Sequence, residues 1–193
     1  MTHLPGSRRN THESDKAGQT EEPLRFFTPT KDFASSLGRL ARQAFSETFQ
    51  HLYEPAPFQQ FLDEAYGPGG KMEQGLADPS IQWRAATAGE RPIGYAKLSL
   101  LVAPAPAPRA GAMELQQIYV LAPWQGKGVA ESLMQWAIDT ARDAGAPELY
   151  LTVFDHNARA KRFYTRHGFS EVGQCTFTLG ARVDNDRVWR KTL

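Results

Sequence analysis

Residues 115–144 read LQQIYVLAPWQGKGVAESLMQWAIDTARDA, and this stretch decides how the chain folds. Its opening, residues 115–121, is rich in β-branched and aromatic side chains and is followed by Pro123, which predicts a strand. From Val129 onward, apolar residues recur at helical spacing until Gly145, which ends the helix because glycine accepts a positive φ. The free N–H groups at the start of such a helix suit a phosphate.

The spacing of the glycines separates the common kinds of phosphate-binding turn. A P-loop needs Gly at position 121 and Ser or Thr at position 128, whereas this chain has Leu121 and Gly128. A dinucleotide-binding fingerprint that begins at Gly126 needs Gly or Ala at position 131, where Glu131 stands. Both common nucleotide-binding patterns are therefore excluded.

Two segments resemble the signatures of the Gcn5-related N-acetyltransferases (GNAT). Residues 125–130, QGKGVA, resemble that family's acyl-CoA loop, with a ligand-free strand-to-helix turn as the alternative. Residues 157–169, NARAKRFYTRHGF, resemble its second signature, Asn-x-x-Ala-x-x-Phe-Tyr followed by Gly-Phe. The resemblance covers about residues 24–193 and implies the GNAT fold, an α/β fold whose mixed central sheet splays apart and is flanked by four main helices.

The resemblance implies acetyl-CoA as co-substrate, without a metal. The pantetheine arm would pair with the backbone of Ile118 and Val120 in the gap of the sheet, a contact that needs no particular side chain. Lys127 would approach the phosphates. The cofactor-binding residues that we expect are Ile118, Tyr119, Val120, Gln125, Gly126, Lys127, Gly128, Val129, Ala130, Asn157 and Ala160.

Amide formation from a thioester requires a neutral amine and a proton for the departing thiolate. An amine with a pKa of about 10.4 is neutral only about once in a few thousand at pH 7, so a base is useful. By resemblance, Tyr164 is the general acid, although a core tyrosine on an amphipathic helix is the alternative. Glu114 is the candidate base, because several family members carry a catalytic glutamate at this distance before Gln125; ordered water is the alternative.

The acceptor side is indicated by charge. Residues 43–70 contain no Lys or Arg but four acidic residues, and the first two helices cap the acceptor site in the GNAT fold. An acidic cap attracts a cationic amine, although solvated helix faces explain the same composition. Glu47 and Tyr53 are the expected substrate-binding residues. Residues 47–49 (ETF) and the ending of residues 177–193 resemble the PaiA-type branch of polyamine acetyltransferases.

These observations predict an N-acetyltransferase that acetylates a primary amine of a small molecule, with a polyamine as the leading acceptor. Two alternatives stay open: acetylation of a peptide or protein amino group, and a CoA-binding sensor module without turnover. A homodimer is also left open.

Composition sets the remaining expectations. The chain has 193 residues and a net charge of +1, which gives no basis for a nucleic-acid or membrane partner. Residues 1–22 lack aromatic side chains and are expected to be a flexible tail before a domain of residues 23–193. The single cysteine, Cys175, and the absence of an apolar leader favour a cytoplasmic protein. The histidines form no metal-like cluster with Cys175.

Further elements follow from periodicity and turn residues. We expect helices over residues 33–48 and 57–66, a final helical turn over residues 72–77, and a helix over residues 157–167. We expect strands at 24–27, 81–87, 93–102 and 148–154, and a closing antiparallel pair at 171–178 and 187–191. The prolines of residues 104–108 predict an extended surface connection.

Overall fold

The computed structural model describes residues 22–193, so the expected flexible tail of residues 1–22 lies outside the described part except for Glu22. The helices are α1 (Ala34–Phe49), α2 (Pro55–Tyr66), α3 (Lys71–Ala77), α4 (Val129–Asp143) and α5 (Ala158–Arg166), with 3₁₀ turns η1 (Lys31–Phe33), η2 (Gln50–Leu52) and η3 (Ala122–Trp124). The strands are β1 (Leu24–Phe27), β2 (Gln82–Ala88), β3 (Arg91–Leu100), β4 (Met113–Val120), β5 (Glu148–Phe154), β6 (Ser170–Leu179) and β7 (Arg182–Thr192).

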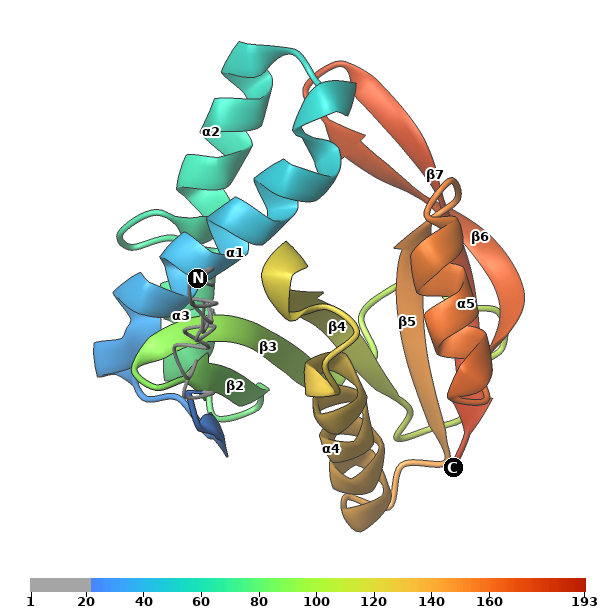
Figure 1. The fold of residues 1–193 in the computed structure, drawn as a ribbon. Helices are drawn as coiled ribbons and strands as arrows, with labels where there is room; N and C mark the ends of the chain where they lie inside the picture. Colours follow the sequence, from blue (N-terminus) through green and yellow to red (C-terminus); the bar gives the residue numbers. More distant parts are fainter. Residues whose placement is uncertain (1–21) are drawn as a thin grey trace, which may run out of the picture.

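In the described part of the chain, the strands form one mixed sheet of seven strands in the order β1-β2-β3-β4-β5-β7-β6. The central pair, β4 and β5, is parallel, as a helical crossover requires. This pair is joined in register only at Met113 with Leu149 and at Glu114 with Tyr150. Beyond these residues the two strands diverge, which Figure 1 shows in the middle of the molecule. The predicted α/β fold with a splayed mixed sheet is confirmed.

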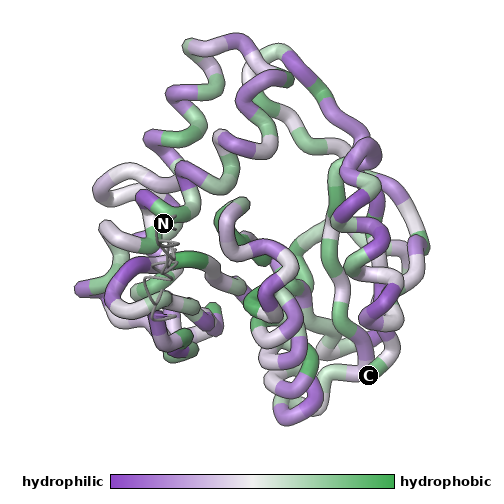
Figure 2. Tube along the Cα trace, viewed as in Figure 1, coloured by the Kyte–Doolittle hydropathy of each residue, from purple (hydrophilic) through white to green (hydrophobic). Residues whose placement is uncertain are grey.

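Each face of the sheet carries its own apolar core, because the helices are amphipathic. Hydrophobic and hydrophilic stretches alternate along α1 and α4 in Figure 2, as one-sided burial requires. On one face, Val129, Leu133 and Ala137 of α4 pack on the sheet and are fully buried. On the other face, Leu37 and Phe45 of α1 pack with residues of α2, β2 and β3. The cleft described below lies where the sheet opens between these layers.

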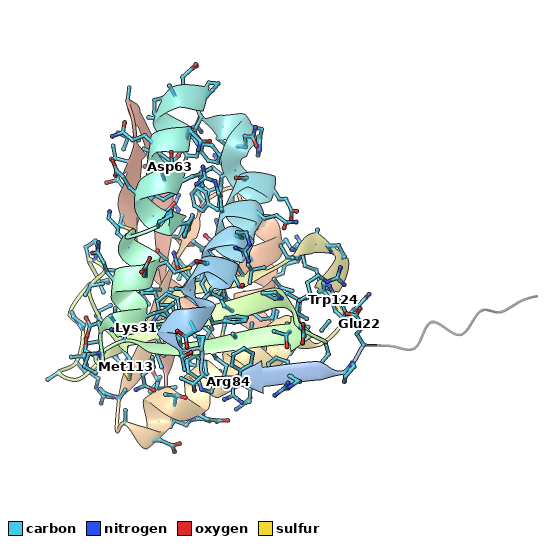
Figure 3. The ribbon with its side chains drawn as sticks, turned by 90° about the vertical axis from the view of Figure 1, so that its left-hand side faces the viewer. Glu22, Lys31, Asp63, Arg84, Met113 and Trp124 are labelled. Carbon is cyan, nitrogen blue, oxygen red and sulfur yellow. The ribbon has the colours of Figure 1, made fainter. Side chains whose placement is uncertain are left out.

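The connection between α1 and α2 is tied to the β6–β7 hairpin, and the two meet at the top of Figure 1. The Tyr53 hydroxyl donates to Asp184 at 2.5 Å, and Arg182 donates to the Leu52 carbonyl oxygen at 3.1 Å. Within the helical pair, Arg42 of α1 contacts Asp63 of α2 at 2.7 Å; Figure 3 labels Asp63 on α2. These contacts cover one end of the cleft.

The strand β7 begins earlier than the sequence predicts. Asp184, Asn185 and Asp186 favour turns, so the pattern predicts a start near residue 187. In the structure these residues pair with Phe177, Thr176 and Cys175 of β6. Pairing along a long hairpin outweighs their weak strand preference, and it places both aspartates on the sheet.

Glu22, the first described residue, lies near the β4–α4 turn. Its carboxylate is 3.7 Å from Arg91, whose guanidinium lies 5.9 Å from the centre of the Trp124 ring. Figure 3 shows Glu22 and Trp124 at the same end of the sheet. The start of the described chain is therefore held beside the turn that precedes α4.

Candidate active site

A cleft of about 780 Å³ opens where β4 and β5 diverge. Residues 115–120 of β4 and residues 152–154 of β5 line its two sides. The turn before α4, helix α5, the α1–α2 region and the β6–β7 hairpin complete it. The cleft thus brings together the two signature segments and the acidic region of residues 43–70.

The turn before α4 presents backbone donors to the cleft. Gly126 and Gly128 have φ values of 75° and 81°, and a Cβ atom at either position would meet open space. Conformation, rather than crowding, therefore calls for glycine here. Within residues 22–193, the N–H groups of residues 126–131 donate no backbone hydrogen bond, and Gly128 provides no side-chain cap for α4. Unpaired donors at the positive end of a helix fit a phosphate group.

Side chains around this turn add positive charge and hold its position. Gln125 donates to the Val120 carbonyl oxygen at 2.9 Å and accepts a hydrogen bond from Arg159 of α5. Arg159, Arg162 and Arg166 line the cleft. The Lys127 ammonium lies 4.9 Å from the centre of the Trp124 ring, beside the turn. Of residues 125–130, Gln125, Gly126 and Ala130 line the cleft, whereas Lys127 and Gly128 do not. The Val129 side chain is buried in the core, so only its backbone is available. The charge and the N–H groups around the turn therefore suit an anion.

The edge of β4 that faces the gap is not paired with β5 beyond Glu114. The Leu121 N–H points toward β3 and donates to the Ile93 carbonyl oxygen at 2.9 Å. The Val120 carbonyl oxygen points to the opposite side, where it accepts a hydrogen bond from the Gln125 side chain. Since the N–H and C=O groups of alternate strand residues point the same way, Ile118 also faces the gap. The two residues predicted to pair with an extended ligand thus lie on the correct edge. The Tyr119 side chain points to the α1 face and contacts Phe45.

Helix α5 places Tyr164 in the cleft. The side chain of Asn157 caps this helix by accepting the Ala160 N–H at 3.1 Å, and all three residues line the cleft. Tyr164 is 8% exposed, and burial raises the pKa of its phenol to about 12. The hydroxyl therefore stays protonated at neutral pH and is available as a proton donor.

The structure does not bring Glu114 to the site predicted for it. Its carboxylate is 5% exposed and accepts the N–H groups of Val102 and Ala103, at 3.0 and 2.9 Å. Glu114 is absent from the cleft lining, whereas Gln116, the extra residue of a β-bulge against β3, is part of it. The proline-containing connection after β3 covers Glu114, so this side chain anchors a loop and lies outside the cleft lining.

The end of the cleft under α1 and α2 is acidic and aromatic. The aromatic rings that line it are Phe45, Phe49, Phe61, Tyr66, Phe154 and Phe177. The acids are Glu47, Asp184 and Asp186. Tyr53, one of the predicted substrate-binding residues, lies here with its hydroxyl on Asp184, and burial followed by this hydrogen bond raises the pKa of its phenol. Glu47, the other predicted residue, accepts a hydrogen bond from Gln43 at 2.8 Å.

Sequence reasoning missed Asp184 and Asp186 as site residues. Burial and the neighbouring charge of Asp184 raise the pKa of Asp186 to about 6. The available signal was the spacing of the two acids, which places both on one face if the segment is a strand. That signal was masked by turn-favouring residue types.

Two further properties concern residues 22–193 alone. No group of three or more His, Cys, Asp or Glu side chains in this part of the chain is placed to hold a metal ion. None of its helices combines the length and apolar character needed to cross a membrane.

Comparison with known proteins identifies the family. The sequence profile of the Acetyltransferase (GNAT) family matches residues 39–169, which include both signature segments. The chain belongs to the GNAT family. It is therefore an acetyl-CoA-dependent acyltransferase, and the predicted enzyme class is confirmed.

Individual GNAT relatives agree with this assignment. An uncharacterized N-acetyltransferase of Mycobacterium bovis is 32% identical over 162 residues, which cover 83% of this chain and 97% of the relative. An aminoalkylphosphonate N-acetyltransferase of Salmonella typhimurium is 31% identical over 96 residues, or 50% of this chain and 61% of that protein. The crystal structure of the PaiA N-acetyltransferase from Thermoplasma acidophilum in complex with coenzyme A has a TM-score of 0.72 at 19% identity, covering 89% and 99% of the two chains. That last likeness shows a shared fold.

Proposed function

We propose that this GNAT enzyme transfers the acetyl group of acetyl-CoA to the primary amine of a small cationic molecule, such as a polyamine. The observation that carries the proposal is the polarity of a single cleft. One end has unpaired helix N–H groups and three arginines, and the other end has three acids among aromatic rings. Tyr164 and the free edge of β4 lie in the same cleft.

The donor end suits the phosphates and the pantetheine arm of acetyl-CoA. The N–H groups of residues 126–131 and the cations of Lys127 and Arg159 would hold the phosphates. The gap-facing backbone of Ile118 and Val120 would pair with the amides of the arm, as an added strand pairs with a sheet edge. In this arrangement Asn157 and Ala160 line the passage from α5.

The acceptor end suits a chain that carries positive charge and methylene groups. Carboxylates raise the local concentration of a cationic amine, and aromatic rings bind both its charge and its carbon chain. The acceptor in the name of the Salmonella relative, an aminoalkylphosphonate, supports a small amine as acceptor; its phosphonate is an anion, so it gives no support for positive charge. The Tyr53–Asp184 and Arg182–Leu52 contacts roof this end, which favours a small acceptor over a peptide that needs an open groove.

Chemistry at the junction requires a neutral amine and a protonated leaving thiol. The amine nitrogen forms the new bond to the carbonyl carbon, and the carbon–sulfur bond breaks. Tyr164, whose pKa of about 12 keeps it protonated, donates the proton that the thiolate needs. A protein or peptide amino group as acceptor, and a CoA sensor without turnover, remain the alternatives.

Release of free CoA thiol from acetyl-CoA tests the proposal. The panel would contain spermidine, spermine, lysine, an aminoglycoside and a peptide with a free amino terminus, with an enzyme-only blank because Cys175 can react with thiol reagents. We expect rapid release with the polyamines and slow release with the peptide. Release with the peptide alone would favour the protein-acceptor alternative, and CoA binding without any release would favour the sensor.

A further inference from the structure

Two aspartates on one face of β7 differ sharply in their surroundings. Asp184 and Asp186 are separated by one residue, so both side chains point to the same face, and both line the cleft. The Asp184 carboxylate is 5% exposed and is bound by the Tyr53 hydroxyl at 2.5 Å and by Arg182 at 2.7 Å. The charge of Asp184 is therefore already paired within the protein.

Asp186 has no hydrogen bond or ion pair with another side chain of residues 22–193. Its cross-strand neighbours are Phe154 on β5 and Cys175 on β6, which remove water from the carboxylate without neutralising it. Arg187 follows it in the chain but points to the other face and contacts Asp155 at 3.0 Å. A half-buried carboxylate without a partner thus faces the acceptor end of the cleft.

The titratable groups that face Asp186 come from four elements. They are Asp184 beside it, Cys175 from β6, Tyr53 from the connection after η2, and Tyr119 from β4. Burial raises the pKa of the thiol and of both phenols, so these three groups are neutral at pH 7. Burial and the charge of Asp184 raise the pKa of Asp186 to about 6. Asp186 is therefore mostly ionised at pH 7, yet it binds a proton more readily than an ordinary carboxylate.

Building on the proposed amine acetylation, we propose that Asp186 is the base that takes a proton from the acceptor ammonium, with Asp184 as a positioning residue. The bound ammonium carries three protons, and the amide keeps one. One proton passes to the Asp186 carboxylate before attack and leaves to solvent after the product departs. The other leaves the nitrogen once the new bond has formed and replaces the proton that Tyr164 gives to the thiolate.

Burial favours this proton transfer. A carboxylate and an ammonium are both charged before the transfer, and both are neutral after it, so a poorly solvated site shifts the equilibrium toward the products. A base whose pKa lies near the working pH is also the most efficient kind. Asp184 maintains the high proton affinity of Asp186 by its charge, and Tyr53 and Arg182 hold Asp184 in place.

The variant Asp186→Asn tests the proposal with two amines of different pKa. Spermidine is protonated at pH 7.5, whereas 2,2,2-trifluoroethylamine, a much weaker base, is largely neutral and needs no base before attack. We expect kcat/KM of Asp186→Asn to fall by about 10²-fold to 10³-fold with spermidine and by less than about 10-fold with trifluoroethylamine. The wild-type rate should rise with pH through about 6, and the variant should lack this limb. Exposed Asp143 on α4 provides the control variant Asp143→Asn.

The possible results distinguish the role of Asp186 from the proposed amine acetylation. An equal loss with both amines, or a retained limb near pH 6 in Asp186→Asn, would overturn the role of Asp186 while leaving amine acetylation intact. Partial recovery with Asp186→Glu, at unchanged CoA affinity, would support proton transfer over a structural role. A wild-type enzyme that acetylates neither amine would overturn the proposed acceptor class and the base together.

Discussion

The two ends of the cleft offer different physical means of recognising a ligand. At the donor end, backbone N–H groups of one turn and arginines of one helix face the space for phosphates, and both come from short stretches of chain. At the acceptor end, side chains of α1, β5, β6 and β7 form an acidic, aromatic chamber. Backbone N–H groups are present whatever the side chains, so a donor end built on them suits a ligand that does not vary. An acceptor end built on side chains can change its specificity by single substitutions.

The largest effect should come from Gly128→Glu. A side chain at φ 81° is strained, and the added carboxylate would stand among N–H groups that favour an anion. We expect CoA affinity, measured by calorimetry, to fall by at least about 100-fold, equal to about 2.7 kcal/mol. Gly145, with a φ of 73° at the far end of α4, provides the matched control Gly145→Glu. It should lose similar stability and keep CoA affinity; wild-type affinity in Gly128→Glu would contradict the donor end.

Tyr164→Phe should affect turnover but not binding. Removing one proton donor costs about 10²-fold in kcat, and the ring that packs in the core is retained. Steady-state kinetics should show this loss with unchanged CoA affinity. Tyr150→Phe is the control, because the Tyr150 hydroxyl is buried against Glu148, away from the cleft. An unchanged rate in Tyr164→Phe would remove this residue as general acid.

Asp186→Asn should stabilise the protein at high pH. Its folded-state pKa of about 6 lies above the ordinary value of 3.8, so stability is fully present below pH 4 and is lost as pH rises through 6. Asparagine removes this loss of stability at high pH, because its amide does not ionise. We expect a gain of about 1 kcal/mol at pH 8, reduced because the carboxyl is half exposed, or about 2–4 °C in Tm. Thermal unfolding at pH 4 should show no difference between variant and wild type; an equal gain at both pH values would contradict the cause.

The smallest effect on catalysis should come from Glu114→Gln. The amide oxygen still accepts the N–H groups of Val102 and Ala103, and the side chain does not line the cleft, so kcat should change by less than about 3-fold. Glu114→Ala should instead lower the free energy of unfolding by about 1–3 kcal/mol, since two buried N–H groups lose their acceptor. Chemical denaturation measures this loss. A drop of 10²-fold in Glu114→Gln would restore Glu114 as the base.

The sequence predicts most of the fold because local patterns set it. The stripe of Val129, Leu133 and Ala137 and the stop at Gly145 define α4, and strand β5 has the predicted bounds. The parallel pairing of β4 and β5 follows from the crossover. The early start of β7 could not be predicted, because pairing with β6, rather than the residue types of Asp184 and Asp186, holds it in the sheet.

The candidate site likewise has one part that the sequence predicts and one part that it does not. The turn at residues 125–130 and the Asn157–Tyr164 helix are predicted from their resemblance to the GNAT signatures, and residues of both line the cleft. The burial of Glu114 depends on a loop that folds back over it, and the pairing of Tyr53 with Asp184 joins residues far apart in the chain. Neither contact leaves a local pattern. The acceptor end therefore required the tertiary structure.

The central claim, that an acidic aromatic chamber selects a cationic amine, is tested most directly by comparing kcat/KM for putrescine and γ-aminobutyrate with acetyl-CoA. The two acceptors have the same carbon chain length and the same attacking amine, and differ in a terminal ammonium or carboxylate. The account predicts that putrescine is preferred by at least about 100-fold, because Glu47, Asp184 and Asp186 attract the ammonium and repel the carboxylate. Equal values, or a preference for γ-aminobutyrate, would contradict it.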